Sequence, residues 1–452
     1  MSLPRYGEYK NSGISWLGAV PSHWEVQRLK YACTVFPSNV DKHSRDDEPA
    51  VRLCNYTDVY YNERVTFDMP FMEATASEDQ IAKFTLQADD IIITKDSETA
   101  DDIAIAAHVP EDLPGVVCGY HLSMVRPRAG TSGAFIKRFF DSVYAKAKFA
   151  VSANGLTRVG LGQYALDNVE LPFPPLIEQT AIAAFLDRET AKIDALIAEQ
   201  EKLIALLAEK RQAIISHVVT KGLDPHTPMK DSGVVWLGEV PAHWKVLRIK
   251  HLVASIEQGW SPQCENFPVD SPDEWGVMKV GCVNGGTFRP EENKKLPQEL
   301  EPIPAYSLKC GDLLISRANT RDLVGSAAVV EENFDTLMLC DKLYRLKLVN
   351  GLCDPAHLAA YLGTPQARSQ IELEATGASS SMLNIGQSVI LDLPALVPCV
   401  EEQRAIQQFL RAESERLDSL NTCVNRTVDL LKERRAALIT AAVTGQIDVR
   451  KA

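Results

Sequence analysis

Apolar residues recur at heptad spacing along two long stretches of the chain. In the first, from Glu178 to about Lys221, neither proline nor glycine occurs. A helix of about 44 residues would be about 65 Å long at about 1.5 Å per residue. The apolar positions of its stripe are Ile193, Leu196, Leu203, Leu207 and Ile214, and the polar interruptions are Gln200, Lys210 and His217. This narrow stripe predicts a coiled-coil helix.

The second stretch repeats the pattern 224 positions later, so that Ile193 corresponds to Leu417. Its full set of positions is Leu417, Leu420, Val424, Thr427, Leu431, Arg434, Leu438 and Ala441. Two matched stripes in one chain favour pairing of the helices with each other. The first helix ends where a second globular region begins, and the second helix must return from that region. We therefore expect an antiparallel pair.

Two shorter motifs also occur twice. The opening motif Ser12–Trp24 returns as Ser232–Trp244, and Glu178–Ile182 returns as Glu402–Ile406. Repeats with so long a period imply two copies of one unit, each a globular region followed by a proline-containing exit and a long helix. Such symmetry suits a target that is itself in two parts, and duplex DNA is the commonest such target.

The pattern predicts an α+β fold: two pseudo-twofold-related mixed α/β domains joined by two long antiparallel coiled-coil helices. Apolar runs at 91–93 and 116–117 predict strands, and a helix is expected from about Ala134 to Ala150. The expected regions are a first domain at 1–175, a helix at 176–222, a second domain at 223–397, a helix at 398–445 and a tail at 446–452 that closes onto the first domain.

Charge complicates the DNA interpretation. The formal net charge is −13, whereas DNA-binding proteins are usually basic. Residues 126–148 nevertheless contain six basic residues and a single acid, Asp141. The balance indicates either a DNA-binding protein that borrows positive surface from a partner or a protein that does not contact nucleic acid.

Cysteine usage and hydropathy bear on the compartment. The ten cysteines are scattered singly, which excludes the usual zinc-site spacings and indicates reduced thiols. The chain has no run of eighteen apolar residues. We therefore expect a cytoplasmic protein that does not span a membrane.

The order of these motifs resembles the specificity subunit of type I restriction–modification systems. Besides the opening motifs and the Glu-Gln pairs, the resemblance is carried by the segments Ala88–Lys95, Cys310–Arg317, Glu209–Arg211 and Glu433–Arg435. It covers essentially the whole chain, and the order of the motifs, repeated twice, is more specific than any one of them.

The resemblance implies that each domain is a target recognition domain for one half of a split DNA sequence. It implies that the helices fix the spacer between the half-sites and, with the domain bases, dock two copies of a modification (methyltransferase) subunit. Motor–nuclease restriction subunits would join these. The chain itself would be non-catalytic and hold no cofactor, since S-adenosylmethionine, ATP and magnesium would belong to the partner subunits.

Candidate DNA-reading residues are polar side chains that can reach base edges or phosphates. Loops after the repeated strands supply Lys95, Ser97, Arg317, Asn319 and Arg321. A second pair of loops, 154–158 and 376–380, supplies Thr157, Arg158, Ser379 and Ser380. Residues interpreted as lying on strands complete the set: Arg52, Asn55 and Tyr56 in the first domain, and Lys279 and Asn284 in the second. An ordinary loop or turn role remains open for each.

Other polar and aromatic residues have two interpretations. The basic residues Lys137, Arg138, Lys146 and Lys148 would contact phosphates or form a solvated helix face. The tryptophans of the opening motif are expected to be packing anchors. His23 and His243 are expected to serve in capping or packing.

Two enzyme-like patterns are weak. Gly160–Ala165 fits a dinucleotide-binding fingerprint, but no strand–turn–helix unit is expected around it. Asp273 with Glu292–Lys294 matches a metal-dependent nuclease signature, but Pro290–Lys295 is interpreted as a polar turn. A DNA-independent scaffold or orphan specificity subunit is the main alternative function, and a nuclease is the weakest.

Overall fold

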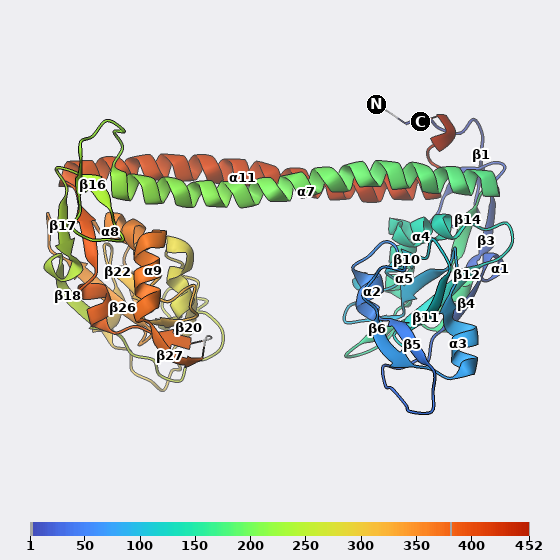
Figure 1. Cartoon of the computed structure of the whole chain (residues 1–452), viewed down its shortest axis with the longest axis horizontal. Helices are drawn as coiled ribbons and strands as arrows, with labels where there is room; N and C mark the ends of the chain where they lie inside the picture. Colours follow the sequence, from blue (N-terminus) through green and yellow to red (C-terminus); the bar gives the residue numbers. More distant parts are fainter. Residues whose placement is uncertain (1–2, 380–381, 452) are drawn as a thin grey trace. The chain divides into compact units, whose positions relative to one another are not determined.

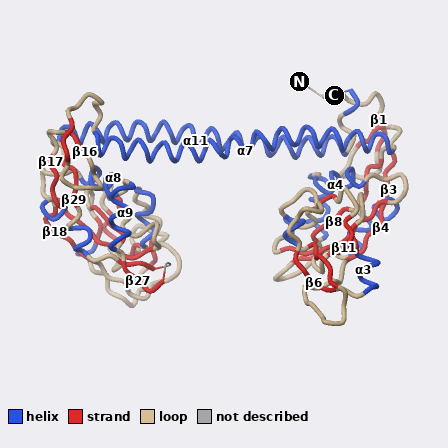
Figure 2. Tube along the Cα trace, viewed as in Figure 1, coloured by secondary structure: helices blue, strands red, loops and turns tan. Residues whose placement is uncertain are grey.

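The computed structural model describes residues 3–379 and 382–451. The chain divides into unit 1, Met1–Glu201 with Asn425–Ala452, and unit 2, Lys202–Val424. Each unit contains one globular domain, named domain 1 or domain 2, and part of each of two long helices (Figure 1, Figure 2). Within the described ranges, no helix combines the length and the apolar character needed to cross a membrane.

Domain 1 is built on two four-stranded sheets. The first has the antiparallel order β10-β8-β12-β4, with strands Ala106–His108, Ile91–Thr94, Leu122–Pro127 and Cys33–Pro37. The second has the order β6-β5-β11-β7, with strands Met72–Thr75, Ala50–Cys54, Leu113–Cys118 and Thr85–Leu86. Ile91 and Ile93 of β8 pack in the core with the helices, whereas Ile92 packs in the core of the second sheet. Burial on both faces explains why β8 is a continuous apolar run.

Smaller elements complete domain 1. The strand pairs are β1 with β2 (Tyr9–Asn11, Ala19–Pro21), β3 with β14 (Glu25–Arg28, Glu170–Phe173) and β9 with β13 (Asp96–Ser97, Val159–Gly160). The short helices are α1 Leu29–Ala32, α2 Tyr56–Tyr60, α3 Glu78–Phe84, η1 Ala100–Asp102 and α6 Gln163–Asn168.

The single helix predicted from Ala134 to Ala150 is wrong, because the segment forms α4, Gly133–Asp141, and α5, Val143–Ser152. Ser142 separates them with an extended backbone. Its hydroxyl donates to the carbonyl of Phe139 at 2.6 Å and accepts from the amide of Ala145 at 3.2 Å. One side chain therefore ends the first helix and caps the second.

Domain 2 repeats this architecture. Its first sheet, β18-β26-β22-β24, has strands Val253–Gln258, Leu343–Leu348, Leu313–Ser316 and Ala327–Val329. Its second sheet, β20-β19-β25-β21, has strands Asn293–Lys295, Gly276–Met278, Phe334–Met338 and Ser307–Leu308. In each domain the central pair of the second sheet is parallel. The predicted repeat of one mixed α/β fold is confirmed.

Several of the remaining elements of domain 2 also have counterparts in domain 1. The helices α8 Pro355–Leu362, α9 Pro365–Glu374 and α10 Gln387–Leu391 correspond to α4, α5 and α6. The other strands are β15 Met229–Asp231, β16 Glu239–Pro241, β17 Lys245–Arg248, β23 Ala318–Asn319, β27 Thr376–Ser379, β28 Met382–Asn384 and β29 Pro394–Val397. The 3-10 segments are η2 Ile249–His251, η3 Val280–Gly286 and η4 Pro304–Tyr306. A further 3-10 segment, η5 Val449–Lys451, lies in unit 1.

The two long helices are α7, Leu176–Lys221, and α11, Val400–Val443, as the heptad pattern predicted. In unit 1, Arg435 binds Asp194 at 2.8 Å, while Ile182 and Val443 share the core of domain 1. In unit 2, Arg211 binds Asp418, while Val218 and Ile406 share the core of domain 2. In each unit residue numbers rise along one helix as they fall along the other, so the helices pair antiparallel.

The contact stripe differs from the predicted one at alternate positions. Ile193 and Leu417 are buried as expected, but Leu196 and Leu420 are 50% and 43% exposed. The side chains turned inward are those one position later: Ile197, Ile204, Arg211 and Val218 on α7, and Asn421, Val428 and Arg435 on α11. Leu-Ile pairs occupy 196–197 and 203–204, so the apolar pattern could not distinguish a spacing of three from one of four.

The tail after α11 lies against the N-terminal segment of unit 1. The amide of Asp448 donates to the carbonyl of Pro4 at 2.8 Å, and Arg450 pairs with Glu178 at 3.0 Å. Gly445 has φ +75°, and a Cβ there would lie 2.3 Å from Pro21. A glycine is therefore required where the chain turns from helix to tail.

Candidate nucleic-acid interface

In domain 1, several predicted residues meet at the short strand β9. Asp96 pairs with Gly160 and Ser97 with Val159, which brings Arg158 beside the segment 95–97. The Asp96 carboxylate lies 2.9 Å from Arg158 Nη2 and 2.9 Å from His121 Nδ1. The Arg158 side chain is 53% exposed. Asp96 therefore holds two nitrogen-bearing side chains at the surface.

Aromatic rings flank this cluster. Lys95 Nζ lies 4.5 Å from the centroid of the Tyr120 ring, and partial burial lowers the pKa of Lys95. Tyr56 stacks on Tyr60 at 5.4 Å. Burial raises the pKa of Tyr56, and its hydrogen bond with Ser97 opposes that effect. Tyr56, Lys95, Ser97 and Arg158 thus form one group, and Thr157 is exposed beside Arg158.

Arg52 and Asn55 have structural roles in domain 1. The predicted strand position is wrong for Asn55 and Tyr56. Arg52, the one residue of the three in a strand, stacks 3.9 Å over Phe67 and donates to its carbonyl at 3.2 Å. Asn55 is the N-cap of α2 and shares a capping box with Asp58, and Tyr56 is the first residue of that helix. The Asn55–Tyr56 pair leaves the sheet because a capping residue ends the strand.

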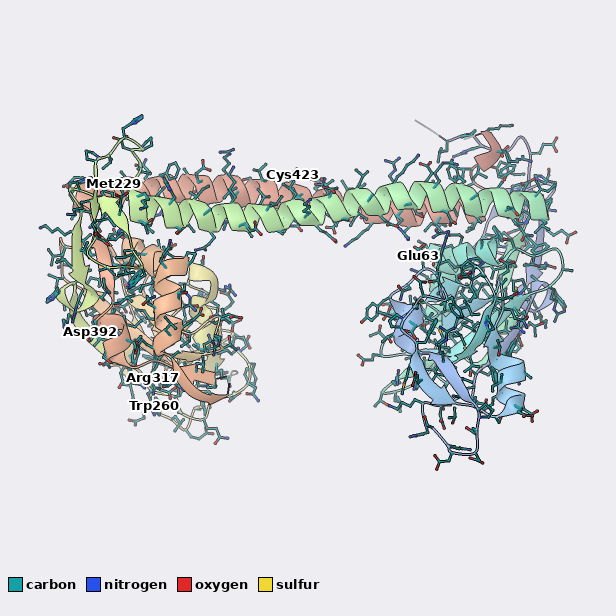
Figure 3. All side chains as sticks on the ribbon, in the orientation of Figure 1. Glu63, Met229, Trp260, Arg317, Asp392 and Cys423 are labelled. Carbon is teal, nitrogen blue, oxygen red and sulfur yellow. The ribbon has the colours of Figure 1, made fainter. Side chains whose placement is uncertain are left out.

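In domain 2 the corresponding group surrounds β23. Asn319 Nδ2 donates to Asn284 Oδ1 at 3.2 Å, and Arg317 Nη1 donates to the carbonyl of Asp341 at 3.3 Å. Figure 3 shows Arg317 toward the end of domain 2 away from its helices. Arg321 is exposed in the following turn.

Three expectations for domain 2 are corrected. Lys279 and Asn284 are not strand-borne: Lys279 is the N-cap of η3 and lies 4.0 Å from Glu292, and Asn284 lies within η3. The predicted loop 376–380 is largely strand β27, which pairs with β28, and β28 pairs with β23. Ser379 therefore belongs to a hairpin beside Asn319, while Ser380 lies outside the described residues.

Sequence reasoning missed the turns that precede β12 and β26. The amide of Lys95 donates to the carbonyl of His121 at 3.2 Å, and that of Arg317 to the carbonyl of Lys342 at 2.8 Å. The signal that could have found these turns is the match of the strands that follow them, Leu122–Pro127 and Leu343–Leu348.

The basic stretch 126–148 is only in part a free cationic surface, with Arg128 and Lys146 exposed. Lys137 and Arg138 are only 4% and 5% exposed, so both the phosphate-contact and the solvated-face interpretations are wrong for them. Arg138 binds Asp187 at 2.7 Å, and Lys137 and Arg138 both form ion pairs with Glu63. Burial would raise the pKa of Glu63, but these cations and Arg435 lower it to about 2. Lys148 pairs with Glu170 at 3.1 Å.

The opening motif and the Glu-Gln pair meet in both domains. His23 binds Glu178 at 2.7 Å, and His243 binds Glu402 at 2.8 Å. Trp24 and Trp244 are fully buried, which confirms them as packing anchors, whereas Trp16 is 62% exposed and contradicts that expectation.

The glutamines of these pairs also have matching roles. Gln179 accepts from the amide of Ser132, the N-cap of α4, at 2.9 Å. Gln403 accepts from the amide of Asp354, the N-cap of α8, at 2.7 Å. Each long helix is thus attached to its own domain through the glutamate and the glutamine of its Glu-Gln pair.

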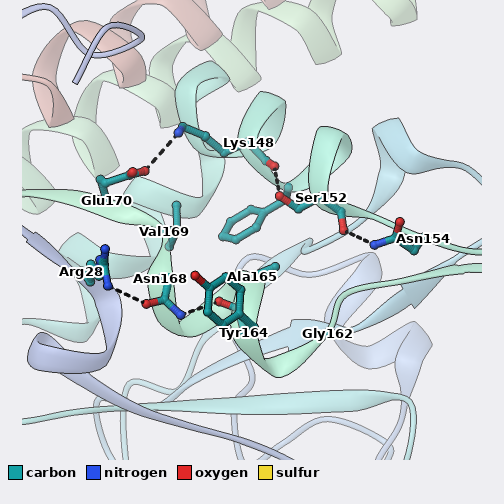
Figure 4. A pocket seen from close by; sticks show the side chains of 11 residues that line it. Arg28, Lys148, Ser152, Asn154, Gly162, Tyr164, Ala165, Asn168, Val169 and Glu170 are labelled. Carbon is teal, nitrogen blue, oxygen red and sulfur yellow. Dashed lines mark hydrogen bonds and ion pairs between the residues drawn. The ribbon is translucent and has the colours of Figure 1, made fainter.

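A hollow of about 450 Å³ in domain 1 is shown in Figure 4. The polar groups that line it bind one another, since Arg28 donates to Asn168 at 3.1 Å and Lys148 pairs with Glu170. In the described part of the chain, no group of three or more His, Cys, Asp or Glu side chains is placed to hold a metal.

The two enzyme-like patterns have different surroundings from those expected. Gly160 ends the two-residue strand β13 and Gly162 caps the six-residue helix α6, which does not form a βαβ unit. Asn293–Lys295 is strand β20 rather than a polar turn, with Asn293 only 3% exposed. The amide of Val269 donates to Asn293 Oδ1, which anchors this strand to the preceding loop.

Comparison with known proteins identifies proteins that are similar to this chain. The family model for the type I restriction modification DNA specificity domain matches residues 21–205. The chain is 28% identical over 197 residues to the EcoEI specificity subunit of Escherichia coli, covering 44% of this chain and 33% of that protein. It is 23% identical over 451 residues to the MjaVIII specificity subunit of Methanocaldococcus jannaschii, covering 95% and 94%.

A solved structure shows the same fold. A chain from a study of complex assembly and conformational transition in the type I R-M system superposes with a TM-score of 0.65 at 17% identity, covering 94% of this chain and 98% of that one. Together with the repeated domains and the paired helices, these matches make the chain similar to the specificity subunits of type I restriction–modification systems.

Proposed function

We propose that the chain is the DNA sequence-specificity subunit of a type I restriction–modification complex, and that each domain reads one half of a bipartite target. The observation that carries this proposal is that one fold occurs twice with different polar side chains at the matched site. Domain 1 presents Arg158 and His121 around Asp96, whereas domain 2 presents Arg317, Asn284 and Asn319. Arginine and asparagine suit guanine and adenine edges, so unlike sets favour unlike half-sites.

The helices α7 and α11 are proposed to hold the half-sites in register. Half-sites about one helical turn apart, roughly 34–36 Å, lie on one face of the duplex and need a stiff connection. Each helix is unbroken over its 46 or 44 residues, and the two pair in both units, which supports this role.

Two copies of a methyltransferase subunit are the proposed partners, with motor–nuclease subunits joining for restriction. The net charge of −13 and the internal pairing of Lys137 and Arg138 leave this chain little free cationic surface for phosphates. Partners that clamp the backbone and flip the target base would supply it. In this proposal the chain is cytoplasmic and non-catalytic, and S-adenosylmethionine, ATP and magnesium are held by the partners.

Genome-wide mapping of methylated adenine, with and without the gene, tests the proposal. A bipartite motif should disappear on deletion. Replacing residues 1–175 with the domain of another family member should change one half of the motif and leave the other unchanged. An unaltered motif in both experiments would refute the proposal, and binding to the methyltransferase without any DNA footprint would favour a DNA-independent scaffold.

The role of the helices has a separate test. Insertion of four residues near Gln200 adds about 6 Å of helix. We expect a longer tolerated spacer or loss of recognition. Full methylation with an unchanged spacer would contradict the ruler role while leaving the reading role intact.

A further inference from the structure

The turns Gly119–His121 of domain 1 and Cys340–Lys342 of domain 2 share one backbone arrangement. In each, the amide of the residue after the turn donates to the carbonyl of its first residue, from Leu122 to Gly119 at 3.1 Å and from Leu343 to Cys340 at 3.3 Å. Each turn also receives the amide of a predicted DNA-reading residue, Lys95 or Arg317. The frame is therefore the same in both domains.

The side chains on this shared frame differ completely. Domain 1 places Tyr120 and His121 there, and domain 2 places Asp341 and Lys342. Tyr120 is 52% exposed and the His121 side chain is 45% exposed, and Lys342 is exposed as well. Residues needed only for folding would be expected to match between two copies of one fold. Exposed residues that differ on a common frame are instead typical of a recognition surface.

Contacts around each turn fix the direction of these side chains. In domain 1, Asp96 binds His121 through Nδ1, so the opposite edge of the ring, with Nε2, turns away from Asp96. The same carboxylate holds Arg158, and Lys95 lies against the face of Tyr120. A neutral histidine with its proton on Nδ1 presents an acceptor at Nε2.

In domain 2, the turn is held by residues at the end of β18 and just after it. Gln258 Nε2 donates to the carbonyl of Asp341 at 2.9 Å, and the Ser261 hydroxyl binds the Asp341 carboxylate. Arg317 donates to that same carbonyl at 3.3 Å. The turn thus positions a residue already predicted to read DNA, and it leaves Lys342 exposed beside it.

We infer that these two turns are base-reading elements, with His121 a specificity-determining residue for one half-site and Lys342 for the other. The inference rests on the proposed function. Asp96 acts through His121 and Arg158 and is a positioning residue. His121 Nε2 would meet an exocyclic amino group of a base, and Lys342 would donate to the acceptors of guanine.

The test uses the full chain assembled with its methyltransferase subunits and a library of duplexes randomised one base pair at a time. Selectivity is the ratio of methylation rates between the preferred base and each alternative, so a general loss of activity cancels. His121→Ala should lower selectivity about fivefold or more at one position of one half-site. Lys342→Ala should do so only in the other half-site. Asp96→Asn should reduce selectivity at the position affected by His121→Ala.

His108→Ala is the matched control. His108 binds Asp89 at 2.9 Å, as His121 binds Asp96, but it lies beside Ile91 at the opposite end of β8 from Lys95. It should leave selectivity unchanged at every position. If His121→Ala and Lys342→Ala also leave selectivity unchanged while the bipartite motif persists, the inference is overturned and the proposed function stands. If the unaltered complex has no bipartite motif, both fail.

Discussion

Domains 1 and 2 share a fold but are attached to the helix segments of their own units in different ways. Domain 1 is held by a charged brace, which we define as Glu63, Arg64, Lys137, Arg138, Asp187 and Arg435. Figure 3 shows Glu63 on the side of the domain that faces the helices. Arg138 and Arg64 bind Asp187 of α7, and Glu63 binds Arg435 of α11.

Domain 2 has a hollow of about 970 Å³ in the corresponding place. It is lined by Arg211, Gln212, Leu410 and Ser414 of the helices and by Ala359, Ala360 and Gly363 of the domain, among others. Ala360 occupies the place that Arg138 has in α4, counted from the N-caps Ser132 and Asp354. Direct bonds remain at the edge of the hollow, such as that from Gln212 to the carbonyl of Gly363 at 2.8 Å. The fold therefore does not dictate the attachment, since a few side chains on one helix face decide it.

The largest effect is expected from Arg138→Ala. This substitution removes one of the two cations that bind Asp187 and one of the two that bind Asp141, so that Arg64 and Lys137 remain, and Glu63 also loses one of its cations. Because the acidic partners are partly exposed, we expect a loss of about 2–4 kcal/mol in the free energy of unfolding of unit 1, less than for a fully buried pair. Denaturant unfolding measures it. A loss below about 1 kcal/mol would show that the brace does not hold domain 1.

Matched substitutions in the helices sharpen the comparison. Arg435 and Arg211 occupy equivalent positions, and each binds an aspartate of the other helix, but Arg435 also binds Glu63. Arg435→Ala should cost about 1–2 kcal/mol, whereas Arg211→Ala, whose ion pair is more exposed, should cost less than about 1 kcal/mol. Thermal unfolding of both variants gives the difference. Equal losses would mean that the extra bond to domain 1 contributes nothing.

Partial filling of the hollow in domain 2 should stabilise it slightly. Ala360 lines the hollow and is half-buried against the core of domain 2. Ala360→Leu adds apolar surface there and should raise the free energy of unfolding by up to about 1 kcal/mol. The same assay as for Arg138→Ala applies. Destabilisation by Ala360→Leu would indicate that the space closes in solution.

Acid should weaken the brace through Glu63. The pKa of Glu63 is lowered from 4.5 to about 2, so the stability it contributes is present above about pH 4.5 and is lost as pH falls toward 2. The effect is expected to be the smallest of the four, because the Glu63 side chain is 45% exposed. Glu63→Gln should reduce the slope of stability against pH between 4.5 and 2. An unchanged slope would assign the acid sensitivity to other carboxylates.

Much of the fold could be predicted because its signals are long and repeated. The echo of Ser12–Trp24 and the absence of proline and glycine after Glu178 required no knowledge of packing. The predicted contact stripe of the coiled coil is correct at alternate positions only, because adjacent Leu-Ile pairs satisfy a spacing of three as well as one of four. The break at Ser142 was missed, because serine has only a weak preference against helix interiors and its capping bonds are local.

The candidate site was harder to predict, because it depends on which loops the fold brings together. Lys95 and Ser97 were predicted from their positions after a strand, and Arg158 was predicted from the loop 154–158. Tyr120 and His121 were missed, because nothing in their local sequence shows that they lie against Lys95. Charge was the least reliable guide: Lys137 and Arg138 were expected to contact phosphates or to form a solvated helix face, and only the positions of Glu63 and Asp187 explain their burial.

The joint formed by each Glu-Gln pair has a consequence for how new specificities arise. Glu178 and Gln179 bind a histidine of the opening motif and the first amide of a helix cap, and Glu402 and Gln403 bind the equivalent groups of the other domain. None of these partners lies in the turns or strands that carry the candidate reading residues. Recombination between genes could therefore exchange a whole domain without redesigning its connector, and mutations could diversify the reading surface without loosening that connector.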